Sequence, residues 1–283
     1  MLPLDELSPA ALSEVVAVFT DIDDTLTTEG QLPAGAYAAL ERLAQAGLEV
    51  VPITGRPAGW CDMIARFWPV AGVVGENGAF YFSYDRAARK MRQRFFATDD
   101  ERRVNRARLE RLRERILREV PGTGIASDQL YREADLAIDV CEDVDPLPAG
   151  EVERVLGIFK EEGAIAKLSS IHVNGWFGDY DKLSMSRIFA ADILGFDLDG
   201  MKDRVIFVGD SPNDGPMFSF FPNSCGVANV EEFRGSGHAL PRFVAHNRGG
   251  EGFVEIAERI LAARGAAQAP APAGGARAEA DHV

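Results

Sequence analysis

The sequence predicts an α/β protein built around an open parallel sheet. Apolar runs recur along the chain, most of them end in a group of polar residues, and helical stretches separate them. The first run, residues 15–19, has the length and the β-branched content that are typical of a buried parallel strand. In an open α/β sheet, the loops beyond the carboxyl ends of the strands usually carry the chemistry.

The first of these loops is rich in carboxylates and hydroxyls. Asp21 and Asp23 are two residues apart at a strand end, so their side chains can point to the same side. Two such carboxylates repel each other, and burying them is costly unless a cation compensates. A hard divalent cation such as Mg²⁺ would resolve the conflict. The alternative is an acidic turn whose Asp and Thr side chains cap the next element.

Composition limits the classes of partner. The chain has 283 residues and a hydrophobic content of 46%, enough for one large domain or two modest ones. Its formal charge of −14 argues against nucleic acid, but a small phosphorylated substrate fits a locally positive site. The three cysteines show neither disulfide nor metal-ligand spacing. Without a signal peptide or a long apolar run, we expect a cytoplasmic protein that does not bind membranes.

The order of the expected elements defines the organisation. The first part reads as helix 32–46, strand 48–53, helix 57–68 and strands 72–75 and 79–82 about an Asn77–Gly78 turn. The middle reads as strand 90–96, helix 99–120, strand 134–140, helix 148–162 and strand 164–173, a small sheet with helices on one face. The last part reads as a helix from Lys182, strands 204–208, 224–228 and 242–245, and helix 250–263.

Three further polar groups stand near ends of these elements. Thr54-Gly55-Arg56 combines a hydroxyl, a flexible backbone and a guanidinium, which suits an anion, although a polar turn before a helix is the alternative. Lys182 begins a helix, where a cation is not favoured by the helix dipole; this indicates that it faces an anion, and a surface lysine at a helix start is the alternative. Asp210 and Asp214 follow another buried strand and add carboxylates opposite the first pair.

In order along the chain, these groups resemble the four motifs of the haloacid dehalogenase-like superfamily. They are Asp21 with Asp23, then Thr54, then Lys182, then Asp210 with Asn213 and Asp214. The family commonly has Gly where this chain has Asp24, a difference that concerns only the shape of the following turn. The resemblance covers about residues 15 to 263 and implies a Rossmann-like parallel core.

The insertion between the second and third motifs resembles the type II cap of subfamily IIB. That group includes Cof-type sugar phosphatases, sucrose-phosphatase, mannosyl-3-phosphoglycerate phosphatase and the eukaryotic phosphomannomutases. We therefore expect a core of residues 1–82 and 178–264 and an inserted α+β cap of residues 83–177. Residues 265–283 are rich in Ala, Pro and Gly, and we expect them to form a disordered tail.

The resemblance implies a Mg²⁺-dependent phosphatase that forms an aspartyl-phosphate. Asp21 would be the nucleophile and Asp23 the general acid and base, while Thr54 and Lys182 neutralise the phosphoryl charge. The residues expected to bind the phosphate are Thr54, Gly55, Arg56, Lys182 and Asn213. The residues expected at the metal are Asp21, Asp23 through its backbone carbonyl, Asp210 and Asp214. Asn213 and Asp214 would also hold Lys182.

The cap is expected to select the substrate, because the core motifs contact only the phosphoryl group and the metal. The segment 172–176 offers hydrogen-bonding groups and the aromatic face of Trp176, which suit a hydroxylated ring. We therefore predict a sugar phosphate or a phosphorylated glycoside as the small-molecule partner. A phosphomutase of the same superfamily and a non-catalytic phosphate-binding protein are the alternatives.

Overall fold

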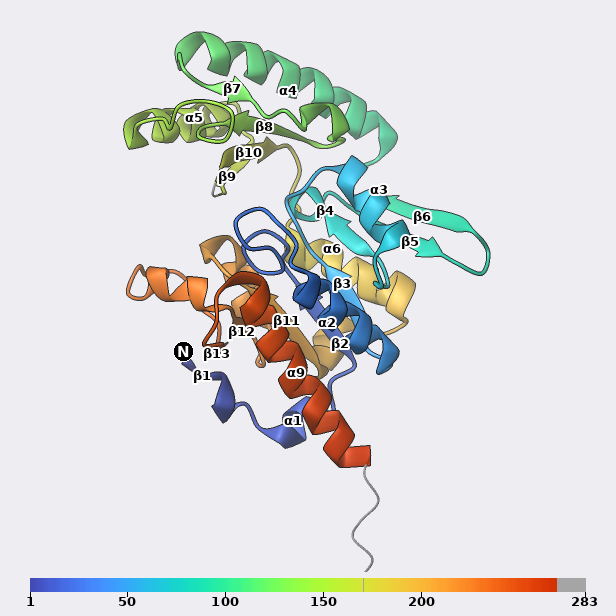
Figure 1. The fold of residues 1–283 in the computed structure, drawn as a ribbon. Helices are drawn as coiled ribbons and strands as arrows, with labels where there is room; N and C mark the ends of the chain where they lie inside the picture. Colours follow the sequence, from blue (N-terminus) through green and yellow to red (C-terminus); the bar gives the residue numbers. More distant parts are fainter. Residues whose placement is uncertain (170, 269–283) are drawn as a thin grey trace, which may run out of the picture.

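The computed structural model describes residues 1–169 and 171–268, and its largest sheet is parallel (Figure 1). The strand order is β1-β13-β12-β11-β2-β3, and every neighbouring pair runs parallel. The strands are β1 (Leu2–Pro3), β2 (Ala17–Thr20), β3 (Glu49–Pro52), β11 (Val205–Gly209), β12 (Cys225–Gly226) and β13 (Phe243–Val244). The predicted α/β class with a parallel sheet is confirmed.

Helices cover both faces of this sheet because its central strands are buried on both sides. In β2, Val18 belongs to one apolar cluster and its neighbours Ala17 and Phe19 belong to another. The first cluster packs against α1 (Pro9–Ser13), α2 (Ala34–Gln45), α3 (Ala58–Phe67) and α9 (Gly249–Gln268). The second packs against α6 (Lys182–Phe189), α7 (Leu198–Met201) and α8 (Gly215–Phe220). The strand ends on both sides of β2 are therefore fixed by packing.

A three-stranded antiparallel sheet extends from the edge of the parallel sheet. It consists of β4 (Val73–Gly75), β5 (Phe80–Asp85) and β6 (Lys90–Phe95). Thr54 N donates to Val74 O at 2.9 Å, which connects the end of β3 to β4. The predicted domain boundary at residue 83 lies inside β5, so strand pairing favours a boundary after Phe96. The division into core and cap remains a prediction.

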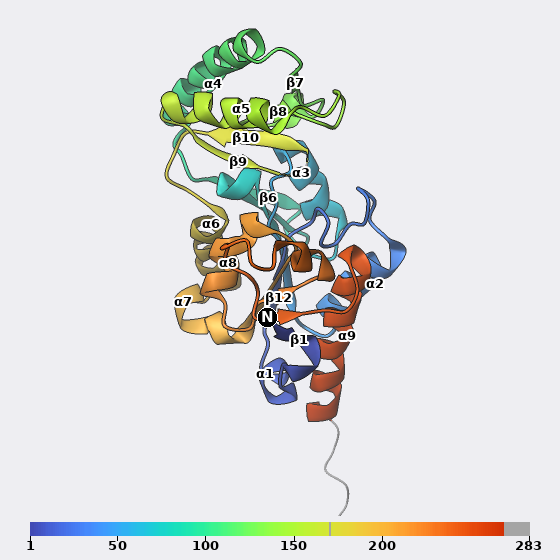
Figure 2. The same cartoon turned by 90° about the vertical axis from the view of Figure 1, so that its left-hand side faces the viewer.

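A separate four-stranded antiparallel sheet forms the lobe above the core (Figures 1 and 2). Its elements are α4 (Asp99–Glu119), β7 (Gly124–Ile125), β8 (Asp135–Asp139), α5 (Ala149–Glu161), β9 (Ile165–Leu168) and β10 (His172–Trp176). The helices α4 and α5 pack on one face, where Leu136, Ile138 and Val173 meet them. Since side chains alternate along a strand, the opposite face carries Asp135, Asn174 and other polar residues.

The prediction of one strand over residues 164–173 is wrong. The chain reverses there, and β9 pairs antiparallel with β10, for example Lys167 with Asn174. Ser169 stabilises the reversal, because Ser169 N donates to His172 O at 2.8 Å and Ser169 Oγ accepts from His172 N at 3.0 Å. The polar Ser169 inside an apolar stretch is the local signal for this turn.

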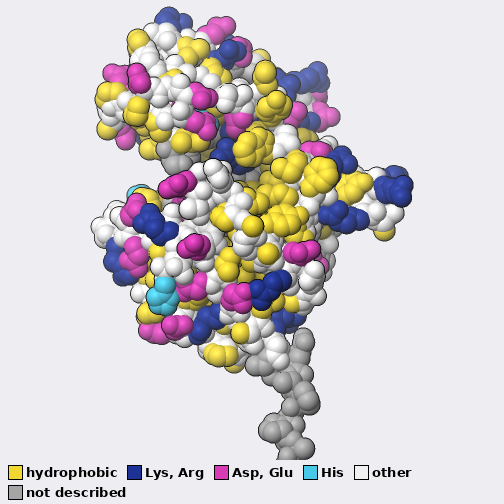
Figure 3. Space-filling model, in the orientation of Figure 1, with side chains coloured by type: hydrophobic (Ala, Val, Ile, Leu, Met, Phe, Trp, Pro, Cys, Tyr) yellow, Lys and Arg dark blue, Asp and Glu magenta, His cyan; other side chains and the backbone are white. Residues whose placement is uncertain are grey.

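The C-terminal helix and the molecular surface complete the description. α9 continues to Gln268, beyond the predicted helix end at residue 263, so residues 265–268 of the predicted tail are helical; the rest of that tail lies outside the described residues. None of the helices within residues 1–169 and 171–268 is long and apolar enough to cross a membrane. In the space-filling view the molecule narrows between the two lobes, and hydrophobic side chains gather over α3, which exposes Trp60, Met63 and Phe67 (Figure 3).

Candidate active site

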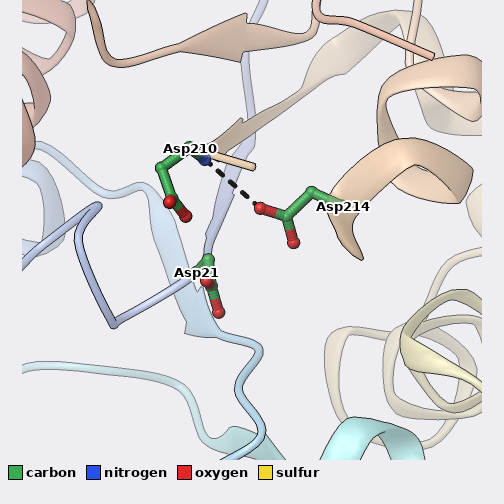
Figure 4. A group of neighbouring side chains, drawn as sticks. All are labelled: Asp21, Asp210 and Asp214. Carbon is green, nitrogen blue, oxygen red and sulfur yellow. Dashed lines mark hydrogen bonds between the residues drawn. The ribbon is translucent and has the colours of Figure 1, made fainter. Parts of the chain in front are cut away.

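Three carboxylates meet at the carboxyl edge of the parallel sheet (Figure 4). Asp21 directly follows β2, Asp210 directly follows β11, and Asp214 ends the turn that comes next. Because β2 and β11 pair in parallel, their ends lie side by side. One oxygen from each carboxylate lies within 4.8 Å of the other two. Asp210 N donates to Asp214 Oδ2 at 3.3 Å, the contact drawn in Figure 4.

Lys182 is the cation that reaches this acid cluster. Its Nζ donates to Asp21 Oδ1 at 2.9 Å and to Asp214 Oδ1 at 2.8 Å. The side chain extends from the first residue of α6, whose N-cap Asp181 accepts from Ser184 N at 2.7 Å. This local cap sets the helix start and therefore the origin of the lysine. The expectation that Lys182 faces an anion agrees with this geometry.

The protonation equilibria reflect an excess of buried negative charge. Burial raises the pKa of Asp21 to about 7, and Asp214 and Asp23 add to this effect although Lys182 opposes it. Burial, Asp214 and Asp21 raise the pKa of Asp210 to about 9. Burial disfavours the charged form of Lys182, but Asp21 and Asp214 outweigh it and raise its pKa. One ammonium therefore does not balance the three carboxylates.

The chemistry of this acid cluster fits a hard divalent cation. Mg²⁺ prefers oxygen ligands, and Asp21, Asp210 and Asp214 offer one carboxylate oxygen each within a short span. A bound cation would also favour the ionised carboxylates, which burial disfavours. Three of the four residues predicted at the metal are thus brought together by their side chains.

The side chain of the fourth, Asp23, points to a different partner. Arg56 Nε lies 2.9 Å from Asp23 Oδ1 and 3.0 Å from Oδ2, and Nη2 lies 2.7 Å from Oδ1. The guanidinium also lies 4.6 Å from the centre of the Trp60 ring. Arg56 was predicted to bind phosphate, but in the structure it holds the carboxylate of Asp23. A metal contact of Asp23 through its backbone carbonyl stays a prediction.

The remaining predicted phosphate-binding residues lie nearby with defined partners. Thr54 is fully buried, and its Oγ1 accepts from Arg56 N at 3.0 Å. Gly55 lies at the wall of the cavity described below. Asn213 Oδ1 accepts from Ser211 Oγ at 2.9 Å. The contact to Lys182 comes from Asp214, so the expectation that Asn213 also holds this lysine is wrong.

A cavity of about 830 Å³ opens above the acid cluster, between the two lobes. The core contributes Asp21, Asp23, Arg56, Lys182, Asp210 and Asn213 to its wall. The upper lobe contributes Arg132, Lys167, His172 and Asn174. A ligand in the cavity would therefore touch both lobes.

Comparison with known proteins shows what the chain resembles. Residues 18–105 match the family model of haloacid dehalogenase-like hydrolases, and this segment carries Asp21, Asp23 and Thr54. The chain is also 26% identical over 243 residues to a phosphoglycolate phosphatase of Methanospirillum hungatei, covering 84% of this chain and 94% of the relative. Both comparisons agree with the resemblance that the motifs indicate.

Solved structures share the fold. A HAD/COF-like hydrolase from Plasmodium vivax superposes with a TM-score of 0.66 at 20% identity, covering 89% of this chain and 98% of that one. A Thermoplasma acidophilum protein gives a TM-score of 0.67 at 18% identity, with coverages of 87% and 98%. A sucrose-phosphatase from Synechocystis, solved with sucrose and phosphate, gives 0.59 at 14% identity, with coverages of 87% and 97%. These structures support the fold over nearly the whole chain.

The structure explains the Asp at the position where the superfamily commonly has Gly. Asp24 has a φ of 56°, in the left-handed region that Gly adopts without strain and that Asp tolerates better than most residues. Asp24 N donates to Thr27 Oγ1 at 2.9 Å, which stabilises the turn. The turn therefore keeps a Gly-like backbone.

The predicted aromatic surface for a sugar ring is wrong. His172 and Asn174 do line the cavity, but Trp176 has no exposed surface. Its ring stacks on Tyr180 at 5.7 Å and belongs to the apolar core. Side chains alternate along a strand, so His172, Asn174 and Trp176 share one face of β10. Trp176 is at the end of β10 where the sheet of the upper lobe meets the core.

Sequence reasoning missed a second buried charge cluster, which we call the junction cluster: Glu76, Asp128, Arg132 and Asp135. Glu76 Oε1 accepts from Ala58 N at 3.0 Å and from Glu133 N at 2.9 Å. Its Oε2 accepts from the N–H groups of Ala134 and Asp135 at 2.6 and 3.2 Å. One core carboxylate therefore holds the start of β8.

Arg132 completes the junction cluster from the side of the upper lobe. It donates to both oxygens of Asp128 at 2.9 Å and to both oxygens of Asp135 at 3.1 Å. It also donates to Gly55 O at 3.1 Å, directly beside Arg56. The only sequence signal was Glu76 in the Glu-Asn-Gly turn, because its partners in the upper lobe lie more than fifty residues away.

Proposed function

We propose that this protein is a phosphatase, which hydrolyses phosphomonoesters with Mg²⁺ and through an aspartyl-phosphate on Asp21. The observation that supports this most is the buried group of Asp21, Asp210, Asp214 and Lys182 at the carboxyl edge of the sheet. Phosphoryl transfer needs a positioned nucleophile and positive charge around the phosphoryl oxygens, and this group can supply both.

The chain's own residues account for both steps. An oxygen of Asp21 attacks phosphorus, the bond to the leaving oxygen breaks, and Asp23 gives that oxygen a proton so that an alcohol departs. Asp23 then takes a proton from water, the water oxygen attacks phosphorus, and the bond to Asp21 breaks to release phosphate. Arg56 fixes Asp23 for both transfers through its contacts to both carboxylate oxygens.

Lys182 and a cation held by the acid cluster would compensate the negative charge of the transferred phosphoryl group. Lys182 orients the Asp21 carboxylate and places an ammonium beside the transferred group. Asp21 and Asp210, with Asp214 beside them, would hold Mg²⁺, which supplies Lewis-acid neutralisation of the phosphoryl oxygens when bound. Thr25 Oγ1 donates to Asp210 Oδ1 at 3.1 Å and so orients this carboxylate.

The leaving group is proposed to be a sugar or a glycoside. The cavity is large enough for such a group, and its upper wall offers polar side chains such as His172 and Asn174. The sucrose-phosphatase of the same fold supports this class. A short hydroxy acid is the second candidate, because the sequence relative is a phosphoglycolate phosphatase.

Phosphate release separates this proposal from its alternatives. The protein is incubated with a panel of sugar phosphates and phosphorylated acids, with EDTA, and with Mg²⁺ or Ca²⁺ restored. We expect phosphate release with Mg²⁺, none in EDTA, and little with Ca²⁺, whose larger coordination shell disturbs the in-line geometry.

Each other outcome has a clear meaning. Full activity in EDTA would contradict the metal assignment. Isomerisation of a sugar phosphate without phosphate release would indicate a phosphomutase. Binding of phosphate esters without any turnover would indicate a non-catalytic binding protein.

A further inference from the structure

Lys167 lies in the wall of the active-site cavity, on the upper lobe. It is in β9 and pairs with Asn174 of β10, so both side chains project from the same face of the sheet. The neighbouring Ala166 packs with the cluster under α4 and α5, which places Lys167 on the opposite, core-facing side. The lysine thus faces the core site from above.

Lys167 differs from the other cations of the cavity in its partners. The lysines and arginines in the cavity wall are Arg56, Arg132, Lys167, Lys182 and Arg248. Four of them contact carboxylates: Arg56 contacts Asp23, Arg132 contacts Asp128 and Asp135, Lys182 contacts Asp21 and Asp214, and Arg248 contacts Glu232. Among the residues that the structure describes, Lys167 has no carboxylate within ion-pair distance.

The surroundings of the Lys167 ammonium favour the binding of an anion beside it. Burial lowers the pKa of Lys167, and repulsion from Lys182 lowers it further. The two ammonium groups therefore act on each other across one cavity. A carboxylate beside Lys167 would offset the cost of its partial burial.

We propose that Lys167 binds a carboxylate on the leaving group, which favours a phosphate ester of a hydroxy acid, including a sugar acid, over a phosphate ester of a neutral sugar. This inference rests on the function proposed above. One ammonium matches one carboxylate, whereas a neutral hydroxyl leaves the charge of Lys167 uncompensated. A second phosphate would carry more negative charge into a cavity that already has six carboxylates in its wall: Asp21, Asp23, Asp24, Glu29, Asp210 and Glu232.

Asn174 supplies a second contact for the same group. Its Nδ2 donates one hydrogen to Asp135 Oδ2 at 2.9 Å, and an amide nitrogen carries two hydrogens. Asn174 also lines the cavity and is the cross-strand neighbour of Lys167. The junction cluster thus orients Asn174, and Asn174 and Lys167 together form a carboxylate site.

The test compares pairs of esters that differ by a carboxylate. The pairs are phosphoglycolate with ethyl phosphate, 3-phosphoglycerate with glycerol phosphate, and 6-phosphogluconate with sorbitol 6-phosphate. The kcat/KM of the full chain with Mg²⁺ is measured for the native protein, Lys167→Met, Lys167→Arg and the exposed control Lys160→Met.

We expect the native protein to prefer the acid in at least one pair. Lys167→Met should lower kcat/KM for that acid by about 10- to 100-fold, mainly through KM, as loss of a charge-assisted hydrogen bond predicts. The neutral ester should change less than about 3-fold, Lys167→Arg should recover part of the loss, and Lys160→Met should match the native protein.

Two outcomes would overturn the inference while leaving the proposed function intact. One is a native preference for the neutral member of every pair, and the other is an equal loss on both members in Lys167→Met. Calorimetric binding of the same pairs tests Lys167 independently of turnover. If no ester is hydrolysed but the acid still binds more tightly and Lys167→Met removes that preference, the proposed function fails and the carboxylate site stands. Equal binding of both members overturns the site.

Discussion

The acid cluster, taken together with Lys182, has the same formal composition as the junction cluster. The two clusters differ in how many hydrogen-bond donors their carboxylates receive. Each contains three carboxylates and one cation, Lys182 in the first and Arg132 in the second. At the junction, Glu76 alone accepts four backbone N–H groups, and Arg132 binds both oxygens of each Asp. In the acid cluster, the side chain of Asp210 receives a single donor from the part of the chain that the structure describes, the hydroxyl of Thr25.

The difference lies in the supply of hydrogen-bond donors. A buried carboxylate that receives its full set of donors belongs to the structure, whereas one that lacks donors favours a cation or a ligand. By this criterion the junction cluster connects the two lobes, and the acid cluster is the one that we propose to bind metal and phosphate. The junction cluster also contacts the loop beside the active site. Arg132 donates to Gly55 O, and the next residue, Arg56, contacts the Asp23 carboxylate.

The largest expected effect is on catalysis at the acid cluster. Asp21→Asn should lower turnover by at least about 10³-fold, because the amide cannot form the covalent intermediate. The variant should still fold, since the amide oxygen can accept from Lys182. Phosphate release and circular dichroism measure both properties, with the exposed Asp203→Asn as control. Near-normal turnover of folded Asp21→Asn would contradict the assignment of the nucleophile.

The junction cluster should respond in stability. Glu76→Gln places an amide NH₂ against two backbone N–H donors, so it should lower the free energy of unfolding by about 2–4 kcal/mol. Urea denaturation at pH 8 measures this change. The control Glu133→Gln removes surface ion pairs with Arg102 and Arg106 and should cost less than about 1 kcal/mol. Equal stability of the two variants would show that Glu76 does not hold the lobes.

Removing a charge from the acid cluster should raise the free energy of unfolding, whereas Glu76→Gln in the junction cluster should lower it. In EDTA, Asp210→Asn should raise the free energy of unfolding by about 1 kcal/mol, because it relieves repulsion from Asp214 and Asp21. The same variant should lose most of the stabilisation that Mg²⁺ gives to the native protein. If Asp210→Asn destabilises the metal-free protein as Glu76→Gln does, the two clusters do not differ in the way described.

The smallest effect concerns pH. Folding raises the pKa of Asp21 to about 7 and that of Asp210 to about 9, so the unfolded chain releases these protons at lower pH than the folded chain does. Stability should therefore fall as pH rises from about 4 to about 9, and Tm in EDTA should be a few degrees lower at pH 8 than at pH 5.5.

The pH dependence of the stability can be assigned to one of the two clusters. Glu76, with a pKa raised to about 8, contributes in the same direction. Mg²⁺ should reduce only the part that comes from the acid cluster, and so should Asp210→Asn. A slope that neither Mg²⁺ nor Asp210→Asn changes would place the titration at the junction cluster.

The sequence by itself determined the parallel core and the position of the acid cluster. Asp21 and Asp210 each follow an apolar run directly, and parallel strands bring their carboxyl ends to one edge. The anionic surroundings of Lys182 were also predictable, because a cation at a helix start is disfavoured by the helix dipole unless an anion lies nearby. These signals are local, since each depends on a strand or helix and its adjoining residues.

Only the tertiary structure decided which side chains pair. Arg56 meets Asp23 across 33 residues, and Glu76 meets Glu133 N across 57, distances over which periodicity carries no information. The packing of the upper lobe on the core buries Trp176 and leaves Lys167 without a carboxylate within ion-pair distance among residues 1–169 and 171–268. Pairing of buried charges depends on the packing of whole elements, so the sequence gives the residue types of the site and the fold gives their partners.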